Sequence, residues 1–138
     1  MFFVGTMGKL IVFLDKVTNL IDNDTFGKSD PYVKFELEQD NLMFDKDFGT
    51  KYSTKKKDDL NPEWGETFTF ENVPGLNNLV LKVTVKDDDP IVDDKLGSCK
   101  INLEELGLTS DPTGIDRVVD NNIICKDARI FLRISFEE

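Results

Sequence analysis

The chain carries, over residues 22–37, the run Asp22-Asn23-Asp24-Thr25-Phe26-Gly27-Lys28-Ser29-Asp30-Pro31-Tyr32-Val33-Lys34-Phe35-Glu36-Leu37. The first half is rich in Asp, Asn, Gly and Ser, residues that favour turns and loops. In the second half apolar and polar residues alternate, which places Val33, Phe35 and Leu37 on one face of a strand. The run therefore predicts an acidic loop that leads directly into a half-buried β-strand.

Similar strand patterns lie on both sides of this run. Residues 10–14 are continuously apolar, as in a strand that is covered on both faces, and alternating patterns follow at residues 67–70, 79–85, 99–103 and 130–136. Turn signals separate them at Asn61-Pro62, Val73-Pro74-Gly75, Asp89-Pro90 and Asp111-Pro112. We expect about eight short strands in an all-β antiparallel sandwich. One helical turn is expected at residues 103–106, and loops are expected at residues 38–50 and 107–122.

A second acidic cluster follows the strand pattern at residues 79–85. It comprises Asp87, Asp88 and Asp89, followed after three residues by Asp93 and Asp94. If folding brings the two clusters together, their carboxylates share a space that mutual repulsion opposes. A hard cation removes this conflict, and calcium accepts about six to eight oxygen ligands in flexible geometry. The two clusters therefore predict a calcium site.

An EF-hand loop is an alternative for the cluster that begins at Asp22. Asp24 and Gly27 would occupy its third and sixth positions. Position five is Phe26, however, and position twelve is Val33, where that loop needs a bidentate glutamate. The EF-hand is therefore excluded.

Composition restricts the classes of function. The chain has 138 residues, 39% of them hydrophobic, which is enough for one packed domain. It has 17 Lys and Arg against 27 Asp and Glu, so its net charge is −10. This charge argues against a nucleic-acid partner, and against constitutive binding to an anionic membrane unless a bound cation changes the local sign.

The remaining composition gives expectations about chemistry and location. Cys99 and Cys125 lack the spacing of a zinc-ligand pair, and Cys99 lies in a strand pattern that indicates a small core residue. With no disulfide indicated, no signal peptide and no membrane-spanning run, we expect a soluble, cytoplasmic protein. Clustered aspartates can hold catalytic magnesium, but the chain has no histidine and no phosphate-binding glycine loop, so we expect no enzyme.

Three motifs in order resemble the C2 domain family. The first, Asp24-x-x-Gly27-Lys28-Ser29-Asp30-Pro31-Tyr32-Val33-Lys34, is similar to the family's first calcium-binding loop and the strand after it. The second, Leu60-Asn61-Pro62-Glu63-Trp64-Gly65-Glu66-Thr67-Phe68, resembles the family's Asn-Pro-x-Trp-x-Glu-x-Phe segment, in which we expect Trp64 to be a buried anchor. The third, Asp87-x-Asp89 with Asp94 before Gly97, resembles its third loop.

The resemblance implies an eight-stranded antiparallel Greek-key β-sandwich with ion-binding loops at one end. The domain would span residues 9–138, after an N-terminal extension at residues 1–8. Because no strand pattern precedes the one at residue 10 and a last strand follows all motifs, it resembles the second topology of the family, found in phospholipase C and small plant members.

The resemblance also implies a ligand set for two or three calcium ions. The carboxylate ligands would be Asp24, Asp30, Asp87, Asp89 and Asp94. Backbone carbonyls at Thr25 and Asp88 would complete the shell. The third loop is about one residue shorter than in common members, so Asp93 competes with Asp94 for its role.

Two further groups bear on membranes. Phe26, Ile91 and Val92 are either ordinary loop residues or groups that insert into the interfacial region of a bilayer. Lys34, Lys51, Lys55 and Lys57 lie where relatives bind phosphoinositide head groups, or they belong to a solvated strand face that nearby acids dilute.

We therefore expect a module for signalling or vesicle trafficking that binds anionic, phosphatidylserine-type membranes when calcium is bound, and so joins membranes peripherally. The alternative is a β-sandwich that binds protein partners without calcium.

Overall fold

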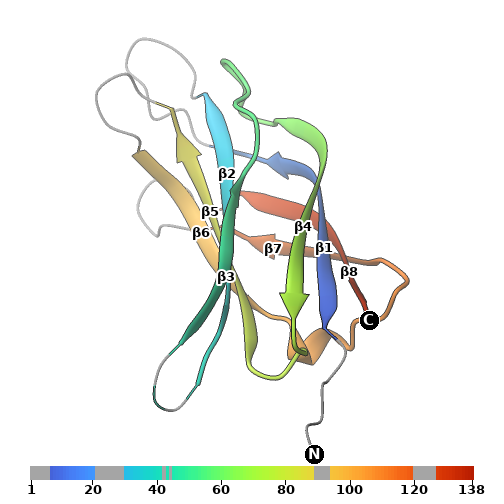
Figure 1. The fold of residues 1–138 in the computed structure, drawn as a ribbon. Coiled ribbons are helices and arrows are strands. Elements are labelled where there is room, and N and C mark those ends of the chain that lie inside the picture. The colour runs from blue at the N-terminus through green and yellow to red at the C-terminus, as the bar shows by residue number, and fades with distance from the viewer. Residues whose placement is uncertain (1–6, 21–29, 42, 44, 89–93, 120–126) are drawn as a thin grey trace, which may run out of the picture.

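The structure is a computed structural model that describes residues 7–20, 30–41, 43, 45–88, 94–119 and 127–138. Within these residues it contains eight strands and one short 3-10 helix (Figure 1). Their bounds are β1 (Gly8–Thr18), β2 (Pro31–Gln39), β3 (Lys46–Tyr52), β4 (Glu63–Val73), β5 (Leu79–Asp87), β6 (Asp94–Asn102), η1 (Glu104–Leu106), β7 (Thr113–Val118) and β8 (Arg129–Glu137).

The strands form two four-stranded antiparallel sheets. Sheet A has the order β4-β1-β8-β7, and sheet B has the order β3-β2-β5-β6. Val33, Phe35 and Leu37 of β2 are fully buried, as the alternation predicted, and so are Leu81 and Val83 of β5. The predicted all-β antiparallel sandwich is therefore confirmed.

The apolar run at residues 10–14 lies in β1, a central strand of sheet A between β4 and β8. The last strand, β8, follows all the motifs in the sequence, as expected, and lies between β1 and β7. The boundary predicted between residues 8 and 9 stays a prediction, because residues 1–6 lie outside the described part of the chain.

Trp64 is buried, with 8% of its surface exposed, and its Nε1 donates a hydrogen bond of 2.8 Å to the Thr54 carbonyl. The preceding Asn-Pro turn pairs with the end of β1, because Asn19 N–H donates to Asn61 Oδ1 at 2.9 Å and Val17 N–H to the Pro62 carbonyl at 3.0 Å. The segment is therefore structural, as predicted, and it fixes the end of β1.

Two predicted loops were partly wrong. Residues 38–50 contain most of β3, and residues 107–122 contain β7. Both strands lie at sheet edges and are largely exposed or half-buried, so their sequences lack the continuous apolar signal of the inner strands. The predicted helical turn at residues 103–106 is confirmed as η1.

Among the described residues, no helix is long and apolar enough to span a bilayer.

Candidate metal centre

Asp30 of the first acidic cluster meets Asp87 and Asp88 of the second at one end of sheet B. Asp30 directly precedes β2, and Asp87 is the last residue of β5. Pro31 lies opposite Asp87 in the ladder, Asp30 N–H donates to Asp87 Oδ1 at 2.8 Å, and Asp88 N–H donates to the Asp30 carbonyl at 3.0 Å. Residues 57 positions apart in the sequence are thus in direct contact. We call this region the acidic end.

The carboxylates of the acidic end are held by backbone donors. Asp87 has only 4% of its surface exposed and is one of three buried polar residues in the described part of the chain. Burying a carboxylate is costly unless it is paired, and the Asp30 N–H supplies one partner. Asp30 in turn accepts a bond of 2.8 Å from Asp58 N–H through Oδ1. Both side chains are therefore oriented before any ligand binds.

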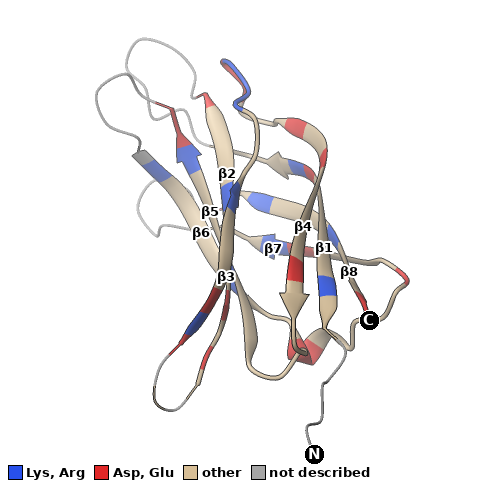
Figure 2. Ribbon diagram, in the orientation of Figure 1, with Lys and Arg blue, Asp and Glu red and all other residues tan. Residues whose placement is uncertain are grey.

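Asp88 has a cationic partner. Lys55 Nζ lies 3.1 Å from Asp88 Oδ1, and it also lies 5.5 Å from the ring centroid of Tyr32. Lys55 belongs to the lysine-rich segment between β3 and β4, which Figure 2 shows at the same end as the acidic ends of β2 and β5.

Asp94 is placed at this end by its backbone, since it lies opposite Asp87 in the β5–β6 ladder. The other predicted residues of the site lie outside the described residues: Asp24, Thr25, Phe26, Asp89, Ile91, Val92 and Asp93. Their assigned roles stay predictions.

The described donor set fits a hard divalent ion. Its side chains are carboxylates: Asp30 and Asp87 are in direct contact, Asp88 is bonded to Asp30 through its backbone, and Asp94 lies opposite Asp87 in the ladder. Calcium and magnesium prefer such carboxylate oxygens, whereas zinc and copper sites in proteins generally include nitrogen or sulfur ligands. The acidic end is therefore the candidate metal centre.

The four lysines predicted as a patch do not share one face. Lys34 lies opposite Tyr52 and Phe35 lies opposite Lys51, so Lys34 and Lys51 are on opposite sides of the sheet. Lys34 forms an ion pair with Glu36 at 3.4 Å, and Lys51 Nζ lies 6.0 Å from the Phe70 ring centroid.

Sequence reasoning missed a set of lysines on the outer face of sheet B. In the ladder Lys82 lies opposite Lys100, and Lys86 lies opposite Lys95. Lys82, Lys95 and Lys100 line a hollow of about 220 Å³. A hydrogen bond and charge attraction from Glu38, 2.9 Å away, raise the pKa of Lys82. In the sequence, residues 82, 84 and 86 alternate with the buried residues of β5, which indicates that they share the outer face. Which residues of β6 lie beside them depends on the strand register, and the sequence does not give that register.

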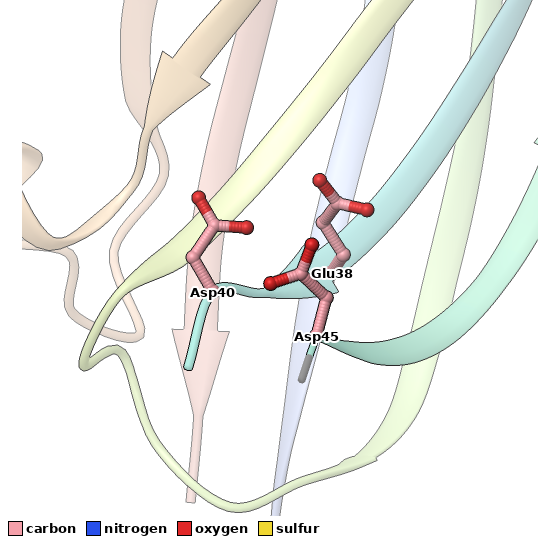
Figure 3. A group of neighbouring side chains, drawn as sticks. All are labelled: Glu38, Asp40 and Asp45. Atoms are coloured by element: carbon pink, nitrogen blue, oxygen red, sulfur yellow. The ribbon is translucent and has the colours of Figure 1, made fainter. Parts of the chain in front are cut away.

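A second acidic group lies at the opposite end of β2 (Figure 3). Glu38, Asp40 and Asp45 each have a carboxylate oxygen within 4.8 Å of the others. Residues 38–50 were expected to be a polar loop, so this group was not predicted. Glu38 already has a cationic partner in Lys82, and exposed acids often cluster without an ion.

The sequence of this chain matches a protein-family model and known proteins. The family model for the C2 domain matches residues 8–118. Human synaptotagmin-1 (Homo sapiens) is 38% identical over 108 residues, which cover 76% of this chain and 24% of that protein. Synaptotagmin-A of Diplobatis ommata is 42% identical over 91 residues, which cover 64% of this chain and 20% of that protein. The chain thus spans about a quarter or less of the length of these relatives.

Solved structures show the same architecture. The first C2 domain of a plant extended synaptotagmin 1 has a TM-score of 0.80 at 24% identity, and the match covers 94% of both chains. The calcium-bound pair of C2 domains of extended synaptotagmin 2 has a TM-score of 0.72 at 26% identity, over 94% of this chain and 45% of that one. Human GIVD cytosolic phospholipase A2 matches through 18% of its chain at 20% identity, which shows the fold alone. Together, the strand order, the motif residues and the match over residues 8–118 establish that this chain belongs to the C2 domain family.

Proposed function

We propose that this domain binds anionic phospholipid membranes when calcium occupies the acidic end. The observation that carries the proposal is the contact between Asp30 and Asp87, which joins two acids that are 57 positions apart in the sequence. The similarity to a calcium-bound C2 structure supports calcium as the ion.

The proposed carboxylate ligands are Asp24, Asp30, Asp87, Asp89 and Asp94. Carbonyls of Thr25 and Asp88 would contribute, with Asp93 as an accessory ligand. Bound calcium supplies positive charge and coordination positions that lipid phosphate or carboxylate oxygens can fill. The backbone donors that hold Asp30 and Asp87 orient these side chains in advance, so the switch is electrostatic and needs little backbone movement.

Membrane contact in this proposal involves two surfaces. Phe26, Ile91 and Val92 insert into the interfacial region once the acids beside them are neutralised, and each large apolar side chain contributes roughly 1.5–3 kcal/mol if fully buried. The outer face of sheet B supplies the second surface, where Lys86, Lys95 and Lys100 would attract anionic head groups, including phosphoinositides.

The chain would therefore act in the cytoplasm as a non-enzymatic targeting module for signalling or vesicle trafficking. Reciprocal coupling follows, because lipid that completes the ion shell must raise calcium affinity by the factor by which calcium raises lipid affinity.

The test is sedimentation with phosphatidylserine vesicles in calcium or in chelator. The wild type should pellet in calcium only, and Asp87→Asn/Asp89→Asn should remain in solution. Asp40→Asn makes the same kind of charge change at the opposite end of β2 and should pellet as the wild type does. If the wild type pellets equally in calcium and in chelator, or if the double variant pellets fully in calcium, calcium-dependent docking at the acidic end is refuted. Equal pelleting of the wild type in chelator would favour calcium-independent binding.

A further inference from the structure

Residues 53–60, in the segment between β3 and β4, are bound closely to the acidic end. We call these residues the lysine loop. Lys56 N–H donates to the Pro31 carbonyl at 2.9 Å, and Asp58 N–H donates to Asp30 Oδ1 at 2.8 Å. The Lys55 ammonium lies 3.1 Å from Asp88 Oδ1. Lys55, Lys56 and Asp58 of this loop thus contact the two segments that contain Asp30 and Asp88.

The lysine loop is itself anchored to the sandwich. Ser53 N–H donates to the Val33 carbonyl at 2.8 Å, and Val33 N–H donates to Ser53 Oγ at 2.8 Å. The Thr54 carbonyl accepts the hydrogen bond from buried Trp64. Because its backbone is fixed directly before Lys55, the ammonium is presented to the acidic end by the fold.

The Lys55 side chain has a second contact that keeps it there. Its ammonium lies 5.5 Å from the Tyr32 ring centroid, and Tyr32 has only 6% of its surface exposed. A cation over a fixed aromatic ring gains electrostatic attraction from the ring face. Lys55 is thus held between Tyr32 and Asp88, where its charge acts directly on the candidate metal centre.

We propose that Lys55 is an internal counter-cation of the acidic end and sets the calcium concentration at which the domain responds. In the ion-free domain its charge lowers the repulsion among the carboxylates. The same charge opposes an incoming divalent ion, because like charges at short range raise the free energy of the bound state. This inference rests on the proposed function and adds a determinant of calcium affinity that lies outside the two acidic loops.

The expected size follows from the exposure of the pair. The Lys55 side chain is 54% exposed and that of Asp88 is 38% exposed, so solvent screens the interaction. Removing the Lys55 charge should tighten calcium binding about two- to fivefold at low ionic strength, the range that a partly exposed ion pair supports.

Lys55→Gln is compared with Lys57→Gln, which removes the same charge from the same loop. Lys57 is exposed and has no ion pair among the described residues, so it reports only the long-range field. Calcium binding is measured by calorimetry without lipid, in low salt and in about 0.5 M salt, and the melting temperature is measured in chelator. Lys55→Gln should bind calcium more tightly than Lys57→Gln, with the gap closing in high salt, and should melt at a lower temperature in chelator. Lys55→Arg, which keeps the charge, should restore wild-type affinity.

The outcomes separate the two proposals. If the wild type binds calcium and both glutamine variants have equal affinity, the role of Lys55 is overturned while the proposed function stands. If the wild type binds no calcium, both fail. Equal melting temperatures of the two variants in chelator would also contradict the counter-cation, since the Lys55–Asp88 contact would then contribute nothing.

Discussion

Asp58 acts on the acidic end through its backbone rather than its carboxylate. In the sequence it counts as one of the acids that dilute a basic run. In the structure its N–H donates to Asp30 Oδ1, and its φ of 52° lies in the left-handed region, which aspartate tolerates better than most residues. Residue type alone does not reveal this role, because it depends on where the loop passes.

Cys99 is a residue whose environment gives a pH-dependent prediction. It is half-buried against the core, as its strand pattern indicated, and burial raises its pKa from 9.0 to about 11, with an opposing influence from Arg117. Well below pH 9 the thiol is neutral in both the folded and the unfolded chain, and its contribution to the free energy of unfolding is fully present. As pH rises from 9 to 11 the unfolded chain ionises first, so that contribution is lost.

The measurement is urea unfolding of the wild type and Cys99→Ala at pH 8 and pH 10.5. The stability advantage of the wild type should shrink by about 2 kcal/mol at the higher pH, since one pKa unit corresponds to about 1.4 kcal/mol. Cys125 is present in both proteins, so its own titration cancels in the comparison. Parallel pH dependences of the two proteins would show that Cys99 is not desolvated.

The inner strands and the edge strands differ in what their sequences reveal. β2 and β5 could be predicted because alternating apolar residues fill one buried face. β3 and β7 could not, because an edge strand is stabilised by pairing with its neighbour while most of its side chains face solvent. The contact between Asp30 and Asp87 could be expected from the two acidic motifs. The lysine pairs of β5 and β6 could not, because they depend on the strand register, which residue spacing does not give.

The paired lysines of β5 and β6 predict an increase in stability on charge reversal. Like charges directly opposite each other in a ladder are destabilising, and Lys82 faces Lys100. Lys100→Glu should therefore raise the free energy of unfolding at low salt, because an opposite-charge cross-strand pair replaces a like-charge pair.

Lys57→Glu changes the net charge equally in a loop and serves as the control in urea unfolding. A loss of stability in Lys100→Glu relative to this control would contradict the ladder argument. The same substitution should weaken binding to phosphoinositide vesicles, because it replaces a positive charge on the outer face of sheet B with a negative one.

The whole molecule should become more stable when calcium is added. An ion that binds the folded domain and not the unfolded chain adds about 2.7 kcal/mol at one hundred times its dissociation constant. For a domain of this size that corresponds to a rise in melting temperature of roughly 5–15 °C.

The calcium-induced shift, rather than the melting temperature itself, is compared by calorimetry between the wild type, Asp87→Asn and Asp40→Asn. Asparagine at position 87 can still accept the Asp30 N–H bond, so the fold is preserved while one negative charge is lost. The shift should fall in Asp87→Asn and persist in Asp40→Asn. If calcium leaves the wild-type transition unmoved, or shifts all three proteins equally, the acidic end is not the binding site.

The position of β8 between β1 and β7 has a consequence for how the domain is made. β1 is synthesised before β8, and one of its two ladder partners is the segment Arg129–Glu137, more than a hundred residues later. Sheet A therefore closes only after long-range pairing, which slows folding relative to chains with local contacts. Until then one edge of β1, whose residues 10–14 are all apolar, is left without its neighbour. A nascent or truncated chain that lacks β8 should therefore depend on chaperones to avoid aggregation.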